Sequence, residues 1–114
     1  CGDAQAQYDL GLMRLSGDGA PRDEAEAVRL FRAAAESGHA LARYNLGVLL
    51  ATGQGAGKDE IEAHLWLVLA AESGEAAIAE SARRGAAQLA ARIGPDGIAD
   101  SARRLSLRKA GVPA

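Results

Sequence analysis

The chain has 114 residues and a formal net charge of −2, and 48% of its residues are hydrophobic although only 4% are aromatic. With this composition, the hydrophobic core must be built mainly from Ala and Leu in closely packed helices, because sheets favour the β-branched and aromatic residues that are scarce here. The small net charge argues against a general polyanion-binding protein, and the single cysteine, Cys1, excludes an internal disulfide. No apolar stretch approaches the ~20 residues of a membrane span, so we expect none.

The sequence repeats itself at an offset of 36 residues. Residues 2–37 and 38–73 share 17 identical positions, including paired glycines, the Leu-Gly of residues 10–11 and 46–47, and an Ala-Ala-Glu-Ser near each end. A fixed period of this length is typical of helical solenoids, whose units bury their apolar faces only by stacking on their neighbours. We therefore predict repeat one at 2–37 and repeat two at 38–73.

Each repeat is predicted to contain two helices. The second helix of repeat one starts at Asp23, and the helices of repeat two cover about 39–52 and 59–73. The first of these is apolar nearly all round, as expected for a helix packed between neighbours. Asp59 is placed to cap the second helix by accepting hydrogen bonds from its first-turn amides, and Gly74 is expected to end it in the left-handed conformation.

A glycine-rich loop, GQGAGKDE, joins the two helices of repeat two. A phosphate-binding loop reads G-x-x-x-x-G-K-[ST], but here Thr52 stands where the first glycine is needed and Asp59 where the magnesium-binding hydroxyl is needed. The equivalent loop of repeat one replaces Gly57 by Pro21. We therefore expect the glycines to form a turn and predict no nucleotide site.

These repeats resemble the Sel-one-like repeats, which are relatives of the tetratricopeptide class. The resemblance rests on GDAQAQYDLGL, GDGAPRD and FRAAAESG in repeat one, and on GHALARYNLGV, GQGAGKD and AAESG in repeat two. It implies an all-α, right-handed superhelix in a single domain that covers residues 1–114. Relatives often serve as scaffolds in the bacterial envelope or in signalling, which implies a bacterial protein of the periplasm or envelope, with the cytoplasm as the alternative.

Residues 74–109 depart from the repeat pattern and are predicted to form a capping helix pair, similar to the one that often closes arrays in this family. Gly94-Pro95-Asp96 replaces the glycine loop, and Pro95 suits the first position of a helix. Residues 110–114 are a tail. At the other end, Cys1 occupies the place of Ser37 and favours a chain cut from a longer array, while a lipid anchor attached to Cys1 is the rival interpretation.

The resemblance implies that the first helix of each repeat lines a concave face that binds a protein or peptide partner. Tyr8 and Tyr44 recur in register, and aromatic anchors often dominate the energetics of interfaces. Packing between the units is the alternative role for both tyrosines. The predicted partner-binding residues of this concave face are Gln5, Tyr8, Asp9, Leu12, Leu41, Tyr44, Asn45 and Val48.

A second surface differs between the repeats. Arg29 and Arg32 of repeat one become Leu65 and Val68 in repeat two, beside Leu69, so a charged face has turned apolar. Either the capping helices cover this face through Ile98 and Leu105, or it stays exposed and binds a partner or a second copy of the chain.

The sequence carries no pattern that indicates catalysis, a metal site or a cofactor. Neither His39 nor His64 has a second ligand at metal spacing. Ser106 and Lys109 spell S-x-x-K, but the S-D-N and K-T-G motifs of the serine enzymes that use it are absent. We therefore predict an interaction module and no enzyme.

The alternative function is binding of an anionic polymer, either a cell-wall glycan or a nucleic acid. Residues 1–74 carry six Lys or Arg against eleven Asp or Glu, whereas residues 75–114 carry seven against four. Basic ends of this kind attract anionic partners. The arginines concerned are Arg83, Arg84, Arg92, Arg103, Arg104 and Arg108.

Overall fold

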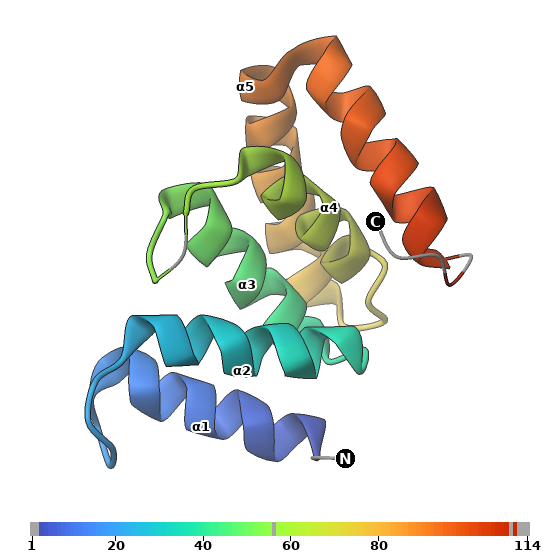
Figure 1. Ribbon diagram of the computed structural model, residues 1–114. Coiled ribbons are helices and arrows are strands. Elements are labelled where there is room, and N and C mark those ends of the chain that lie inside the picture. Colours follow the sequence, from blue (N-terminus) through green and yellow to red (C-terminus); the bar gives the residue numbers. More distant parts are fainter. Residues whose placement is uncertain (1–2, 56, 110, 112–114) are drawn as a thin grey trace.

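The structure, a computed structural model, describes residues 3–55, 57–109 and 111, and these contain helices and turns without a strand. Cys1, the proposed lipid attachment point, lies outside the described residues. Figure 1 shows the helices stacked in pairs, with α1 and α2 at one end and α5 at the other. The all-α solenoid predicted from the sequence is confirmed. The helices are α1 (Ala4–Ser16), α2 (Glu24–Glu36), α3 (Ala40–Thr52), α4 (Glu60–Ala71) and α5 (Ala76–Lys109).

Aspartate caps start the second helix of each repeat, as predicted for Asp59. The Asp59 carboxylate accepts a hydrogen bond from the Glu62 amide at 3.0 Å, and Asp23 accepts one from the Glu26 amide at 3.1 Å. Each bond satisfies an amide of the first turn that has no partner within the helix. The repeated cap therefore fixes the same starting point for α2 and α4.

The prediction for the end of α4 is wrong. Gly38 follows α2 with a φ of 96°, but the chain passes Gly74 without a positive φ. Helix α4 ends instead at Ala71, and the next residue, Glu72, has a φ of −84° and donates its amide to the carbonyls of Leu69 and Ala70. These bonds close the last turn without a left-handed residue, so Gly74 is not needed there.

The glycines of the inter-helix loop do turn the chain. Gly53 ends α3 with a φ of 78°, and Gly55 follows with a φ of 74°. A side chain at Gly55 would also collide with the backbone carbonyl oxygen of Glu24, which lies 2.4 Å from the position of a Cβ. This loop therefore packs against the start of α2 and requires glycine for both reasons.

Close approach at glycine positions holds the helix pairs together. A Cβ on Gly11 would lie 2.8 Å from the Phe31 ring, and a Cβ on Gly47 would lie 2.9 Å from the Leu67 side chain. Leu67 also meets Gly85 of α5, where a Cβ would lie 3.0 Å from it. Leu67 therefore packs against the backbones of α3 and α5 at once.

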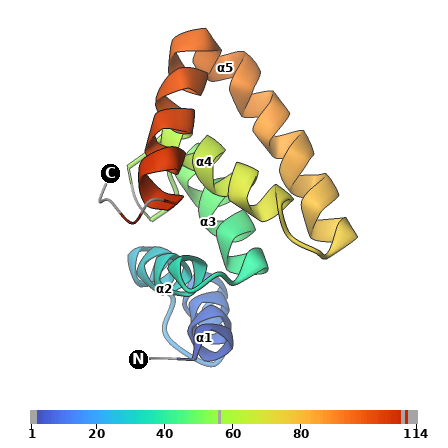
Figure 2. The ribbon, with the colours of Figure 1, turned by 90° about the vertical axis from the view of Figure 1, so that its right-hand side faces the viewer.

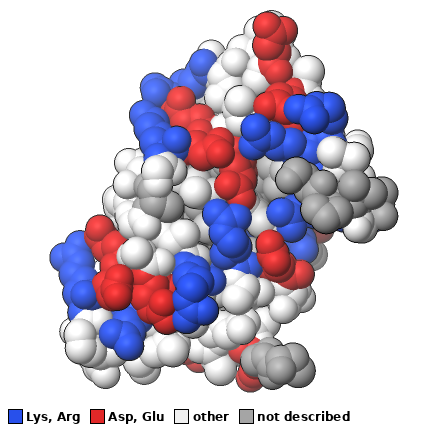
Figure 3. Space-filling view, viewed as in Figure 1, with Lys and Arg blue, Asp and Glu red and all other residues white. Residues whose placement is uncertain are grey.

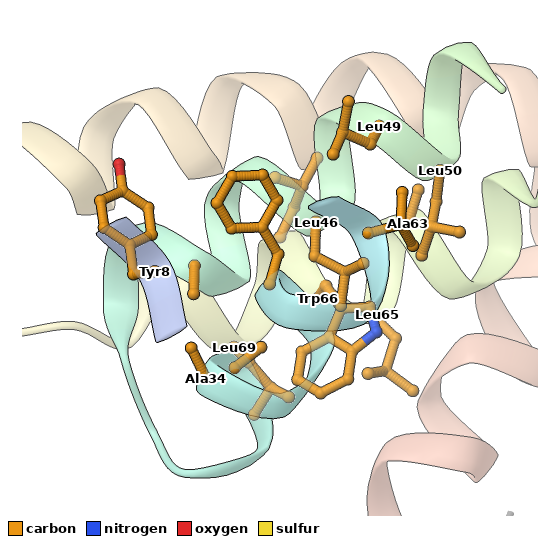
Figure 4. Close-up of a cluster of buried hydrophobic side chains, with 14 of the residues drawn as sticks. Tyr8, Ala34, Leu46, Leu49, Leu50, Ala63, Leu65, Trp66 and Leu69 are labelled. Atoms are coloured by element: carbon orange, nitrogen blue, oxygen red, sulfur yellow. The ribbon is translucent and has the colours of Figure 1, made fainter. Parts of the chain in front are cut away.

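A continuous apolar core runs through the pairs. Figure 4 shows Leu46 of α3 among side chains of α4, including Ala63 and Trp66. The side chains of Leu46, Ala63 and Trp66 have no exposed surface, and Tyr8 of α1 belongs to the same cluster. The repeats consequently share one core.

Gly94 divides α5 into two arms, as the Gly-Pro pair predicted. Its φ of 73° and ψ of −179° are not helical, and Figure 2 shows the second arm turning back beside α4. The first arm consists of residues 76–93 and the second of residues 95–109.

The second arm covers the apolar face of α4, because Leu65 is 2% exposed and Leu105 packs against the main core. The prediction that Ile98 shares this role is wrong, since its side chain is 39% exposed.

Polar contacts fasten the second arm of α5 to the repeats. The guanidinium of Arg108 lies 4.6 Å from the centre of the Trp66 ring and 3.6 Å from the Glu36 carboxylate of α2. His64 of α4 forms a hydrogen bond of 2.7 Å with the hydroxyl of Ser101, which is 2% exposed. The arm is therefore tied to both repeats.

A charged contact also links the two repeats across the core. Burial raises the pKa of the Glu62 carboxyl, but hydrogen bonds from Arg32 and from the Trp66 indole more than offset this, so the pKa is lowered overall. The Trp66 Nε1 donates at 3.1 Å, and Arg32 reaches Glu62 from α2. Glu62 therefore stays ionised and joins α2 to α4.

The glycine contact predicts the effect of a larger side chain. Gly47→Leu should lower the free energy of unfolding by about 1 to 3 kcal/mol, because the new side chain overlaps Leu67 in a packed core. Urea unfolding of the purified protein measures this loss. Gly74→Leu is the matched control, since a Cβ there meets nothing within 4 Å. Equal stability of the two variants would show that α3 and α4 are not closely packed at Gly47.

The half-buried His64 predicts a dependence of stability on pH. Burial lowers the pKa of His64 below its usual 6.5, so the unfolded chain takes up the proton more readily than the folded chain. The stability from neutral His64 is therefore fully present above the unfolded pKa and is lost as the pH falls through the folded pKa. We expect thermal stability to fall as the pH is lowered through and below the usual pKa of 6.5, and His64→Val to reduce that fall. Val28 occupies the equivalent position in repeat one. An unchanged pH dependence in the variant would assign the effect to other groups.

Candidate functional site

The first helices of the units carry the residues predicted for the concave face. Helix α1, helix α3 and the first arm of α5 follow one another at the 36-residue period. The structure leaves Gln5, Asp9, Leu12, Leu41 and Val48 exposed, half-buries Tyr44 and Asn45, and buries Tyr8. The exposed part of the predicted face therefore consists mainly of the side chains around Tyr8 and Tyr44.

Tyr8 lies within the packing between the units. Its side chain is 8% exposed, and its ring stacks on the His39 ring with centroids 4.7 Å apart. The Phe31 ring packs against it at 5.5 Å. The Tyr8 hydroxyl accepts a hydrogen bond of 3.1 Å from the Asn45 side chain. Tyr8 and Asn45 thus connect α1 to α3, which supports the packing role for Tyr8.

Tyr44 has a different environment although it repeats Tyr8. It is half-buried and packs against both apolar clusters of the core. The position equivalent to His39 is Glu75 in the next unit, so the ring that covers Tyr8 has no counterpart over Tyr44. Tyr44 therefore retains exposed surface on the concave face. This difference was visible in the sequence as the change from His39 to Glu75.

The surface is hollowed at two places along the first helices. A hollow of about 890 Å³ lies at the N-terminal ends of α3 and α5 and is lined by residues including Gln5, Leu41 and Arg43. A second hollow of about 510 Å³ lies between α3 and the first arm of α5. Its lining includes Tyr44, Val48, Thr52, Leu67, Gly85, Gln88, Leu89 and Arg92. The second hollow therefore has an apolar floor with polar groups beside it.

Charged groups beside these hollows are engaged within the fold. Arg43 donates to the Ala35 carbonyl at 3.0 Å, and burial lowers its pKa. Arg92 donates a hydrogen bond to the Glu60 carboxylate, which lowers the pKa of Glu60. These contacts fix the walls of the hollows, because each joins two different elements.

The described residues contain no arrangement that indicates chemistry. No group of three or more His, Cys, Asp or Glu among them lies close enough to hold a metal ion. His39 caps α3 by accepting from the Ala42 amide at 3.2 Å. The Lys109 ammonium of the S-x-x-K sequence lies 3.2 Å from Glu72, on an exposed surface. Over the same residues, none of the helices combines the length and the apolar character that crossing a bilayer requires.

The basic C-terminal residues are largely paired with acids. Arg92 contacts Glu60, Arg103 contacts Asp100, and Arg104 lies 3.2 Å from Asp100. Arg108 pairs with Glu36, and Arg84 lies 3.9 Å from Glu80, while Arg83 is exposed. Figure 3 shows acidic and basic side chains intermingled over this view of the surface. Because most of these arginines already contact carboxylates, fewer of them are available to bind a polyanion than the sequence predicted.

Comparison with known proteins finds a family and several similar structures, two of which are described here. The model of the Sel1 repeat matches residues 4–39 and 40–75. The crystal structure of a Sel1 repeat protein from Oxalobacter formigenes matches 67% of this chain with 39% identity and a TM-score of 0.63. A protective antigen of uropathogenic Escherichia coli with an SLR fold matches 94% of this chain with 26% identity and a TM-score of 0.83. The matches span 31% and 22% of the lengths of those two chains. No curated protein sequence matches the chain.

Proposed function

The chain belongs to the Sel1 repeat family, and we propose that its concave face binds a peptide or helix of a partner protein. Repeats of this family generally form protein–protein interaction modules and non-catalytic scaffolds. The proposal for this chain is a scaffold or adaptor that brings a partner to an assembly and catalyses no reaction.

The observation that carries this proposal is an exposed apolar strip on the first helices. The side chains of Leu12, Leu41 and Val48 are 39%, 38% and 38% exposed. Leu12 and Val48 occupy equivalent positions of α1 and α3, and Leu41 lies two helical turns before Val48 on the same side of α3. A partner that covers this apolar strip gains binding free energy of about 25 cal/mol for each Å² of apolar surface removed from water.

The hollow between α3 and α5 extends this strip. Val48 and Tyr44 form part of its lining, and Leu67 and Leu89 supply apolar surface from α4 and α5. An apolar side chain of a partner has room to enter here, beside the polar side chains of Thr52 and Gln88. Interfaces of this kind commonly depend on one anchor in a pocket with polar groups at its rim.

We propose an envelope or signalling assembly of a bacterium as the setting. The support is the likeness to Sel1 repeat structures from Oxalobacter formigenes and from uropathogenic Escherichia coli.

The test compares two equally exposed apolar positions. A partner is first captured with the unchanged protein, and its affinity is then measured for Val48→Asp and for Ile98→Asp. Val48 and Ile98 are 38% and 39% exposed, but only Val48 belongs to one of the first helices of the repeats. We expect Val48→Asp to weaken binding about tenfold or more, because a charge replaces a buried apolar contact. Ile98→Asp should bind normally.

Two outcomes would contradict the proposal. One is equal weakening by both substitutions, and the other is full affinity of the Val48→Asp variant. Titration with NaCl distinguishes the anionic-polymer alternative, because polyanion binding weakens steeply with salt whereas an apolar contact does not. Tyr8→Ala is unsuitable as a probe, since Tyr8 is buried between α1 and α3.

A further inference from the structure

The surroundings of Tyr44 differ from those of Tyr8 by two aromatic rings. In repeat one the Phe31 ring packs against Tyr8, with centroids 5.5 Å apart. Leu67 stands at the equivalent position of repeat two, and its side chain carries no ring. The ring of His39, which stacks on Tyr8 at 4.7 Å, likewise has no counterpart over Tyr44. Tyr44 therefore has neither of the aromatic neighbours that Tyr8 has.

The hollow between α3 and the first arm of α5 lies at this position. Its lining includes both Tyr44 and Leu67, and its volume is about 510 Å³. Protein sites that hold small molecules commonly measure about 300 to 1,000 Å³, so this hollow has room for the ring of a partner's side chain. Aromatic pairs in offset or tilted arrangements are favourable beyond the burial of their apolar area. An aromatic side chain of the partner thus fits the hollow better than an aliphatic one.

The charged residues of the same hollow leave one cation without a partner in the fold. In repeat one, Arg22 pairs with Glu24 at 2.8 Å. The equivalent residues of repeat two are Lys58 and Glu60, but Glu60 accepts its hydrogen bond from Arg92 of α5 instead. Lys58 is exposed and forms no ion pair with any carboxylate in the part of the chain that the structure describes. The lining therefore contains two cations and one carboxylate beside an apolar floor.

We infer that the hollow receives an aromatic side chain of the partner, and that an aspartate or glutamate of the same partner segment pairs with Lys58. The inference rests on the proposed function, because Tyr44 belongs to the predicted partner-binding face. The partner's ring packs on Tyr44 and replaces the contacts that Tyr8 receives within the fold. The partner's carboxylate supplies the negative charge that Glu24 supplies in repeat one.

The spacing of the two contacts limits the partner segment. A Cβ on Gly53 would lie 3.3 Å from the Cβ of Lys58, which places Lys58 at the C-terminal end of α3. Tyr44 precedes Gly53 by nine residues, or about 13 Å of helix. In a helical partner the aromatic and acidic residues are therefore separated by no more than about two to three turns. A peptide of twelve residues is long enough to carry both.

The test uses a phage-displayed library of random dodecapeptides as the probe. The library is selected against the unchanged protein, and the affinity of the selected peptides is measured for Tyr44→Leu, Lys58→Glu and Arg22→Glu. Arg22→Glu is the matched control, because Arg22 is the exposed equivalent of Lys58 and does not line the hollow. Lys58→Glu also alters only an exposed side chain, so it tests the charge contact without disturbing the core.

The selected peptides should contain Phe, Tyr or Trp together with Asp or Glu. Replacing their aromatic residue by leucine should weaken binding to the unchanged protein about threefold to tenfold, and should have little effect on binding to Tyr44→Leu, because the ring pair is already lost there. Lys58→Glu should weaken binding about fivefold or more, and a new selection against it should return Lys or Arg in place of the acid. Arg22→Glu should bind the selected peptides with unchanged affinity.

Peptides without an aromatic residue would overturn the inference, and so would equal affinity of the selected peptides for Lys58→Glu and the unchanged protein. Val48→Asp distinguishes this failure from failure of the proposed function. If such peptides still lose affinity for Val48→Asp, the first helices remain the binding surface and only the inference is wrong. Peptides that bind Val48→Asp normally, or a selection that enriches no peptide, would contradict both.

Discussion

The structure depends on the close packing of Leu67 between two glycines. Leu67 of α4 lies where a Cβ on Gly47 or on Gly85 would approach it to 2.9 or 3.0 Å, so helices on both sides reach it with their backbones. A chain with so few aromatic residues fills its core by bringing helices together at positions of this kind. Leu67 therefore packs repeat two against the first arm of α5. Phe31 against Gly11 repeats the contact in repeat one.

This packing accounts for the position of the surface that we propose for recognition. The second helices are buried between their neighbours, and the second arm of α5 covers the outer side of α4 with Leu105, Arg108 and Ser101. The first helices keep one side uncovered. Their exposed apolar side chains are held in fixed positions by a rigid scaffold, which lowers the entropic cost of binding a partner. The proposed recognition and the packing of the core therefore use different sides of the same helices.

The 36-residue period and local chemistry predicted most of the fold. Asp59 as a helix cap depends on its immediate neighbours, and the structure confirms it. The burial of a side chain by residues far away in the sequence could not be predicted from the repeat period or from local patterns. The burial of Tyr8 requires the ring of His39, which belongs to the start of the next helix. Gly74 and Ile98 were misjudged because the last turn of α4 and the angle between the arms of α5 are set by tertiary packing.

A double-mutant cycle between Gly47 and Leu67 tests the central packing contact most directly. Gly47→Leu, Leu67→Ala and the double variant are unfolded in urea, and the free energies of unfolding are compared. Leu67→Ala alone leaves a cavity and should cost about 2 to 5 kcal/mol. The leucine at position 47 has space only in that background, so the double variant should be more stable than the sum of the two losses by about 1 kcal/mol or more. Additive losses, within about 0.5 kcal/mol, would contradict the direct contact on which the account depends.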